Sequence, residues 1–156
     1  MSRPTVAVID LKALRANFAL AQSLTPGAST IPMVKANAYG HGMIEVSRAL
    51  SESAPAFGVA SIDEALVLRE AGIKQPILLL EGTFSCDEVG VAADNNFILM
   101  VENSAQKDAI LNASISRPVS VWLGIDTGMH RLGFEPHEAT QAYLALSNTD
   151  NVAKPI

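Results

Sequence analysis

The 156-residue sequence has a single cysteine, Cys86, so no disulfide can form within the chain. It has no apolar run near the roughly 18–20 residues that a membrane-spanning helix requires. Its first residues, MSRPTVAVIDLK, lack the features of a signal peptide. Basic residues do not cluster, and the net charge is −5. These absences predict a cytoplasmic enzyme with neither nucleic acid nor a membrane as its partner.

The familiar nucleotide and metal motifs are also missing. The sequence contains no P-loop and no complete G-x-G-x-x-G. Its three histidines, His41, His130 and His137, have no metal-ligand spacing with one another or with Cys86. We therefore predict no metal site.

What the sequence does contain is an alternation of short apolar runs and helical patterns. The runs are too continuous for half-exposed strands and predict strands buried on both faces. They lie at 30–35, 56–61, 76–81, 97–102 and 119–126, with a further candidate at 5–10. From the second run onward, strand starts recur about every 20 residues, which is typical of β-loop-α units in a parallel sheet.

Helix-start signals separate these runs. Asp10 is placed to cap a helix over the following residues, and Pro136 to open a late one. Ser61 with Glu64, and Ser85 with Glu88, have the spacing of capping boxes. Periodicity alone leaves two architectures open, a small open α/β sheet or the front of a (β/α)₈ barrel. We favour the barrel, incomplete here, because the chain stops where Pro155 and Ile156 would begin another strand.

Polar residues close several of the predicted strands. Lys35, Ser61, Glu81, Glu102 and Asp126 each end an apolar run. In parallel α/β folds, active sites form at the carboxyl ends of the strands. The pattern therefore indicates either a shared site or strands that become polar as they reach solvent.

Lys35 stands out because the buried run PMV leads into it and the small residues ANA follow it. Desolvation would favour its neutral amine, the form that attacks a carbonyl. Tyr39 offers a phenol nearby, and Gly40 and Gly42 allow close backbone approach at a helix start, which favours an anion such as phosphate. The alternative is a lysine that extends to solvent.

A second informative stretch is GIDTGMHRLGF, residues 124–134. Its glycines allow a tight loop that projects Arg131 toward the strand ends, where a guanidinium recognises carboxylates or phenolates. A surface arginine paired with a nearby acid is the alternative.

The segments VKANAYGHG and DTGMHRLGF together resemble the two N-terminal signatures of the alanine racemase family, which are fold-type III pyridoxal 5′-phosphate enzymes. The intervening FGVASIDEALVLREAGIKQPILLLEG is also similar. The resemblance implies that Lys35 carries the cofactor as an internal aldimine and serves as one catalytic base. It implies that Tyr39 contacts the cofactor phosphate, and that Arg131 lies near the cofactor's phenolic oxygen and the substrate carboxylate.

The resemblance also implies a domain organisation. Residues 1–10 would be a strand of a C-terminal β-domain that this chain does not include, and residues 11–156 the first part of the cofactor-binding barrel, with about five of eight barrel strands. Family members are homodimers, and their second base is a β-domain tyrosine contributed across the dimer. We therefore expect this chain alone to be inactive. It also has Gly124 where many members have a lysine that is sometimes carbamylated.

Three alternatives stay open at this point. The first is an amino-acid racemase of broader specificity on the same barrel. The second is a non-catalytic, single-barrel pyridoxal phosphate carrier, against which the DTGMHRLGF loop and the 5–10 strand count. The third is a folding or interaction module with an exposed sheet edge.

Overall fold

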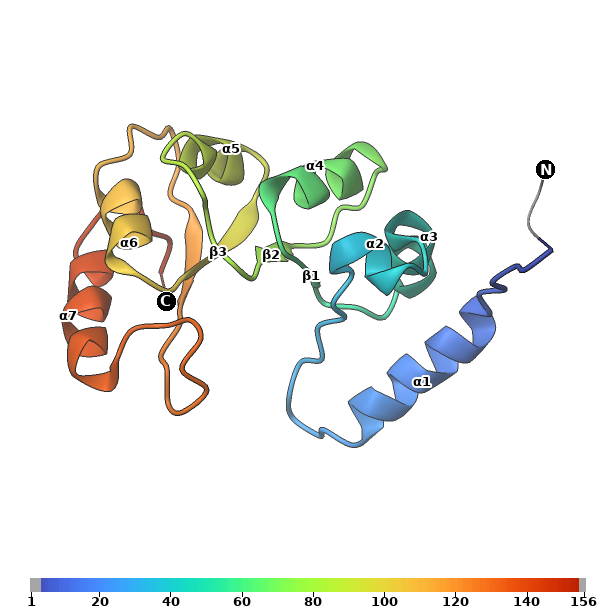
Figure 1. Ribbon diagram of the computed structural model, residues 1–156. Coiled ribbons are helices and arrows are strands. Elements are labelled where there is room, and N and C mark those ends of the chain that lie inside the picture. The colour runs from blue at the N-terminus through green and yellow to red at the C-terminus, as the bar shows by residue number, and fades with distance from the viewer. Residues whose placement is uncertain (1–3, 155–156) are drawn as a thin grey trace.

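A computed structural model describes residues 4–154 of the chain, and its helices and strands alternate along the sequence (Figure 1). The helices are α1 Leu11–Ser23, α2 Lys35–Tyr39, α3 Met43–Leu50, α4 Ile62–Glu70, α5 Glu88–Asp94, α6 Ser104–Leu111 and α7 Pro136–Ser147. The strands are β1 Phe57–Val59, β2 Ile77–Leu79, β3 Phe97–Val101 and β4 Ser120–Leu123.

The four strands form one parallel sheet in the order β1-β2-β3-β4. Phe57 pairs with Ile77, which pairs in turn with Phe97. Because neighbouring strands follow each other in the chain and run parallel, every connection crosses over through a helix. This confirms the α/β class and the arrangement expected for the first part of a (β/α)₈ barrel.

The sheet continues beyond its regular strands on both sides. Met33 bridges to Gly58 at one edge, and Val152 bridges to Val119 at the other. The prediction of a strand over 30–35 is therefore correct only in part. The segment pairs through Val34 N to Gly58 O (2.8 Å) and Gly58 N to Pro32 O (3.0 Å), and then Lys35 already begins α2.

Burial on both faces was predicted for every strand and is confirmed for two of them. All residues of β1 and β2 are buried, whereas β3 alternates between buried and partly exposed residues and β4 buries only Val121. Helix α4 packs against β1 and β2, α5 against β3, and α7 against β4, so one face of the sheet is covered by helices (Figure 1). The core thereby fixes the strand ends, where the candidate site lies.

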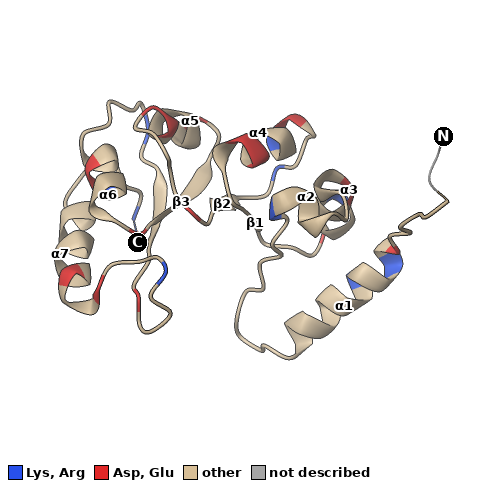
Figure 2. Cartoon of the chain, in the orientation of Figure 1, with Lys and Arg blue, Asp and Glu red and all other residues tan. Residues whose placement is uncertain are grey.

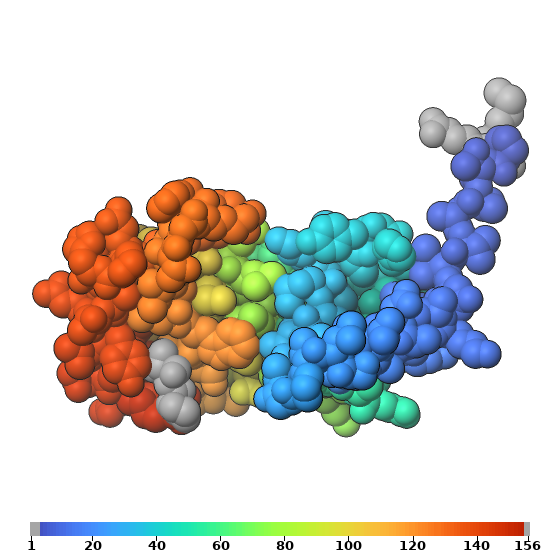
Figure 3. All heavy atoms as spheres, turned by 90° about the horizontal axis from the view of Figure 1, so that it is seen from below, coloured from blue at the N-terminus to red at the C-terminus, as the bar shows by residue number. Residues whose placement is uncertain are grey.

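The N-terminal segment extends away from this body (Figure 3). Residues 5–10 form no strand, and Val6 and Val8 are 78% and 87% exposed. The predicted strand has no partner among residues 4–154, so its assignment to a β-domain stays a prediction. The strand start expected at Pro155 and Ile156 lies outside the described residues.

The helix-start predictions have mixed outcomes. Asp10 caps α1, accepting hydrogen bonds from the amides of Lys12 and Ala13, and Pro136 opens α7. Ser61 is the N-cap residue of α4 as predicted, but neither capping box forms, because the side chain of Ser61 makes no capping hydrogen bond and α5 begins after Asp87 rather than Ser85. Both glutamates instead bind backbone amides outside those boxes.

Figure 2 shows the lysines and arginines among the described residues distributed over several elements. Within residues 4–154, no helix combines the length and apolar character needed to cross a bilayer.

Candidate active site

Lys35 stands where the chain leaves the edge of the sheet. The preceding Val34 is fully buried and donates its amide to Gly58 O, so the backbone that carries Lys35 is fixed by the sheet. The Lys35 side chain is 27% exposed. Its amine is therefore sheltered by the protein and still accessible to a small molecule.

The four residues after Lys35 form a left-handed turn. Ala36, Asn37, Ala38 and Tyr39 have φ values of 50°, 55°, 52° and 53°. Each non-glycine residue in this conformation costs roughly 1–2 kcal/mol, because its Cβ approaches the following carbonyl. Four such residues in sequence therefore require compensating contacts nearby.

Glu64 of α4 supplies one such contact. Its Oε1 accepts a hydrogen bond from Ala36 N (2.6 Å) and its Oε2 one from Ala60 N (2.9 Å). One carboxylate thus joins the residue after Lys35 to the end of β1. The sequence drew attention to Glu64 only as half of a capping box, and its role in holding this turn was missed.

The loop after β4 is also tightly held. Asp126 accepts hydrogen bonds from Gly128 N (2.9 Å) and His130 N (3.0 Å), and its Oδ2 lies 3.0 Å from His130 Nδ1. The hydrogen bonds from the His130 and Gly128 amides lower the pKa of Asp126. Ile125 forms a parallel bridge with Phe134, which closes the loop that carries Arg131.

Lys35 and Arg131 meet at one cavity of about 590 Å³, at the carboxyl ends of the strands. Three predicted strand-end carboxylates, Glu81, Glu102 and Asp126, line it as well. Lys35 Nζ lies 4.0 Å from Glu81 Oε1. Ser61 is not among the lining residues. The side chains predicted to share a site therefore do so, with that one exception.

Gln106 of α6 fixes two of these carboxylates through their backbone. Its Nε2 donates to Glu81 O (2.7 Å) and Thr83 O (3.3 Å), while its Oε1 accepts from Glu102 N (2.9 Å). The side chain is buried beneath the site. Nothing in the helical pattern of SAQKDAILNAS distinguished this glutamine, and sequence reasoning missed it.

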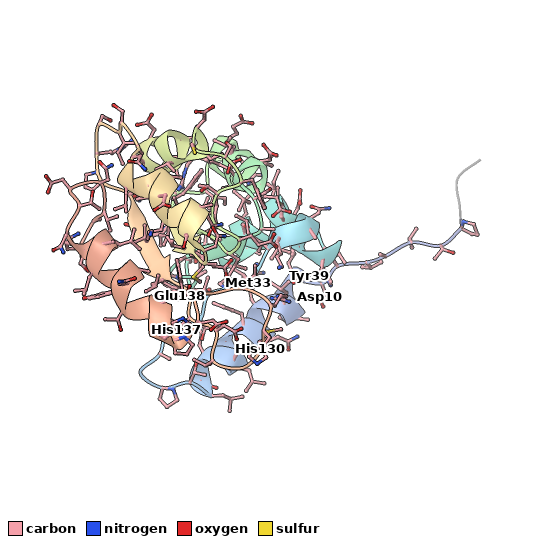
Figure 4. The ribbon with its side chains drawn as sticks, turned by 60° about the vertical axis from the view of Figure 1, so that its left-hand side comes forward. Asp10, Met33, Tyr39, His130, His137 and Glu138 are labelled. Carbon is pink, nitrogen blue, oxygen red and sulfur yellow. The ribbon has the colours of Figure 1, made fainter. Side chains whose placement is uncertain are left out.

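Tyr39 lies outside this cavity. Its side chain is 64% exposed and lines a neighbouring hollow of about 360 Å³ together with Met33 and His41. In Figure 4, Tyr39 and Met33 come from the segment around α2, whereas His130 projects from the loop after β4. The structure therefore brings Lys35 and Arg131 together but places Tyr39 on the adjoining surface.

An anion was expected to bind the free backbone amides at the start of α3. Some of those amides are instead paired within the protein. Met43 N donates to Asn37 Oδ1 (2.9 Å). The Glu45 carboxylate folds back over Gly42, where an added Cβ would lie 2.7 Å from Glu45 Oε2. Among residues 4–154, no three His, Cys, Asp or Glu side chains gather closely enough to hold a metal ion.

Comparison with known proteins agrees with this geometry. The model for "Alanine racemase, N-terminal domain" matches residues 9–155. The chain belongs to the alanine racemase N-terminal domain family. The catabolic alanine racemase of Pseudomonas aeruginosa is 47% identical over 152 residues, which cover 97% of this chain and 42% of that protein. The biosynthetic alanine racemase of Escherichia coli is 46% identical over 149 residues, or 96% and 41% of the two chains.

Solved structures show the same fold. The biosynthetic alanine racemase from Pseudomonas aeruginosa superposes with a TM-score of 0.89 at 40% identity, covering 93% of this chain and 40% of that one. A histidine racemase from Leuconostoc mesenteroides gives a TM-score of 0.77 at 30% identity, covering 91% and 39%. This chain thus spans about two fifths of the length of the alanine racemase family members that it matches.

The residues at the cavity fit pyridoxal 5′-phosphate. An amine that can bond an aldehyde and a guanidinium that can pair with an oxyanion face the same space. A volume of about 590 Å³ lies within the range of small-molecule sites.

Proposed function

We propose that this chain is the cofactor-lysine portion of an alanine racemase, an isomerase that interconverts L-alanine and D-alanine. The observation that carries the proposal is that Lys35 and Arg131 line one cavity at the carboxyl edge of a parallel sheet. The family membership supports it. Its cellular role would be the supply of D-alanine for peptidoglycan in the cytoplasm.

Each residue has a distinct task in this proposal. Lys35 would hold the cofactor covalently and would also move a proton at the substrate α-carbon. Arg131 would bind the cofactor's phenolic oxygen and orient the substrate carboxylate through its fork of donors. Tyr39 would contact the cofactor phosphate. When bound, pyridoxal phosphate supplies the electron sink that stabilises negative charge at the α-carbon.

The rest of the machinery would lie beyond these residues. Racemisation needs a second acid–base group on the opposite face of the α-carbon. We propose that a β-domain tyrosine of a homodimer partner provides it, and that residues 1–10 join that β-domain. The 156-residue chain alone would then be inactive.

A racemase of other or broader specificity is the second candidate, because the histidine racemase named above shares the fold. The substrates offered to the whole protein separate the two candidates. Turnover of histidine at a rate equal to or above that of alanine would favour the second candidate.

Reduction of the cofactor linkage tests the first assignment. The whole protein encoded by the gene is incubated with pyridoxal phosphate, treated with borohydride, digested and analysed by mass spectrometry. We expect the label on Lys35 and loss of the visible absorbance band in Lys35→Ala. Lys12→Ala, which removes an exposed lysine of α1, is the matched control and should keep both. A label on another lysine contradicts the proposal.

Activity is then measured with an assay coupled to D-amino-acid oxidase. Lys35→Ala should abolish racemisation in the whole protein, and the 156-residue chain alone should show none. Racemisation by Lys35→Ala would show that the role given to Lys35 is wrong. Racemisation by the 156-residue chain alone would show that the second base is not missing from it.

A further inference from the structure

Two helices reach back to the strand ends through a side chain of their first turn. Glu64 is the third residue of α4, and its Oε2 accepts a hydrogen bond from Ala60 N (2.9 Å), the first amide after β1. Gln106 is the third residue of α6, and its Oε1 accepts one from Glu102 N (2.9 Å), the first amide after β3. Both side chains therefore hold the end of the strand that precedes their own helix.

The second polar atom of each side chain crosses to the segment that follows the neighbouring strand, and there the two differ. Glu64 Oε1 accepts from Ala36 N (2.6 Å), so both of its oxygens bind amides. Gln106 Nε2 instead donates to the carbonyls of Glu81 (2.7 Å) and Thr83 (3.3 Å). A carboxylate only accepts, whereas a carboxamide also donates. The residue type at each position thus matches the backbone groups that it meets.

The hydrogen bond to Ala36 restrains the backbone of Lys35. Ala36 N belongs to the peptide group that follows Lys35, and Val34 O, in the peptide group before it, accepts from Ala38 N (2.8 Å). Because peptide groups are planar, fixing both of them restricts both backbone dihedrals of Lys35. Ala36 has a φ of 50°, which is unfavourable for alanine, so the bond from its amide to Glu64 opposes relaxation of the turn.

We propose that Glu64 is a positioning residue for Lys35. By binding the Ala36 and Ala60 amides together, its carboxylate holds the Lys35 amine inside the cavity, 4.0 Å from Glu81 Oε1. Glu64 is not among the residues that line this cavity, so it acts on the amine through the backbone. The consequence for cofactor binding rests on the function proposed above. The effect on the position of the amine does not.

The position of the amine is tested on the cofactor-free whole protein by reductive methylation with formaldehyde and cyanoborohydride, followed by mass spectrometry. Glu64→Gln keeps the size of the side chain and one accepting oxygen, but its NH₂ group cannot accept from the second amide. The turn should then loosen and expose Lys35. Because Lys35 is 27% exposed, its methylation should accelerate about two- to fourfold relative to the exposed Lys12.

Glu88→Gln in α5 is the matched control. Glu88 Oε2 accepts from one amide, Phe84 N (2.8 Å), so a glutamine there removes the same charge and can keep the hydrogen bond. It should leave the methylation of Lys35 unchanged. Unchanged reactivity of Lys35 in folded Glu64→Gln protein, or equal acceleration by Glu88→Gln, would overturn the proposal.

A glycine at position 36 tests whether the effect passes through the turn. Glycine adopts a positive φ without the penalty that alanine incurs, so the turn should depend less on Glu64 in Ala36→Gly. Glu64→Gln should therefore accelerate methylation of Lys35 less in this background than in the wild type. Equal acceleration in both backgrounds would contradict a role acting through the turn.

Amide hydrogen exchange provides a measurement that needs no variant. Ala36 is an exposed residue, yet its amide should exchange at least about tenfold more slowly than in an unfolded chain, because it is bound to Glu64. Exchange at the unfolded rate would show that this hydrogen bond does not persist, and the proposal would fail.

The consequence for the cofactor is measured by the Kd for pyridoxal phosphate, from its absorbance titration. Glu64→Gln should raise the Kd about fivefold, the factor that corresponds to one hydrogen bond of ordinary strength. Glu88→Gln should leave it unchanged. An unchanged Kd in Glu64→Gln would refute this consequence. If the wild-type protein does not bind pyridoxal phosphate, the proposed function fails, and the methylation of Lys35 still decides the role of Glu64.

Discussion

Gly133 is the position in the Arg131 loop where a single methyl group should do the most damage. Its φ is +107°, and a Cβ built on it would lie 2.8 Å from Asp126 N and 3.0 Å from Ile125 C. Both are backbone atoms, so no side-chain rotation can relieve the overlap. Gly133→Ala must therefore either strain the backbone or separate the two strands of the loop.

The cost can be estimated from the contacts involved. A non-glycine residue in such a conformation costs about 1–3 kcal/mol. Separation of the loop strands also loses the hydrogen bonds from Asp126 N to Phe134 O and from Phe134 N to Gly124 O, both 2.9 Å. Each contributes about 0.5–1.5 kcal/mol. Strain and opening are alternatives of similar cost, so we expect a loss of about 1–3 kcal/mol.

Urea unfolding of the 156-residue chain provides the assay. Trp122, its single tryptophan, lies in β4 two residues before Gly124 and reports on this region. With a urea dependence of about 2 kcal/mol per molar, the midpoint should fall by about 0.5–1.5 M. Gly90→Ala, the same substitution inside α5, should raise stability slightly because glycine is unfavourable in a helix. A midpoint for Gly133→Ala equal to the wild type would refute the reasoning.

Two further predictions concern the turn after Lys35 and the acid limit of stability. Glu64→Ala removes the acceptor of the Ala36 and Ala60 amides and should lower the free energy of unfolding in urea by about 1–3 kcal/mol. Glu64→Gln should have an intermediate effect. Equal stability of the wild type and both variants would show that Glu64 does not stabilise this turn. The pKa of Asp126 is lower in the folded chain than its unfolded value of about 3.9. The ionised side chain therefore stabilises the fold above about pH 3.9, and this stabilisation is lost as the pH falls through the pKa of the folded state. Asp126→Asn should therefore make the free energy of unfolding less dependent on pH below about pH 4. The same dependence in the wild type and the variant would contradict this.

The sheet was predictable because its signal is local. Four apolar runs predicted β1 to β4, and β1 and β2 are buried throughout as those runs predicted, whereas β3 and β4 are only partly buried. The segment 30–35 shows the limit of this signal. Its apolar run does pair with β1, but the pairing ends at Val34, because Lys35 and Ala36 turn away from the sheet.

The left-handed turn itself could not be read from the sequence. Only Gly40 and Gly42 signal positive φ in ANAYGHG, whereas Ala36 and Ala38 favour ordinary helix. The conformation is imposed by tertiary contacts such as Glu64 with Ala36 N, which no local pattern reveals. Tyr39 was expected near Lys35, four residues before it, and the left-handed turn is followed by a Tyr39 side chain that lines a different hollow.

The meeting of Lys35 with Arg131 was predictable for a different reason. Parallel strands bring their carboxyl ends to one edge, so residues 96 positions apart can share a site without any local signal linking them. The close approach of Gly124 to Glu102 could not be predicted in this way, because only the strand register places the two residues side by side.

The strain after Lys35 indicates what the local structure achieves. Three of the four left-handed residues are not asparagine, and at roughly 1–2 kcal/mol each they cost about 3–6 kcal/mol, against the roughly 5–15 kcal/mol that stabilises a typical domain. Tertiary contacts such as the hydrogen bond from Ala36 N to Glu64 offset part of this cost. The backbone is thereby fixed on both sides of Lys35, through Val34 in the sheet and through Ala36 on Glu64. Such strain is concentrated where position matters more than stability, and here it surrounds the one amine that the proposed chemistry requires.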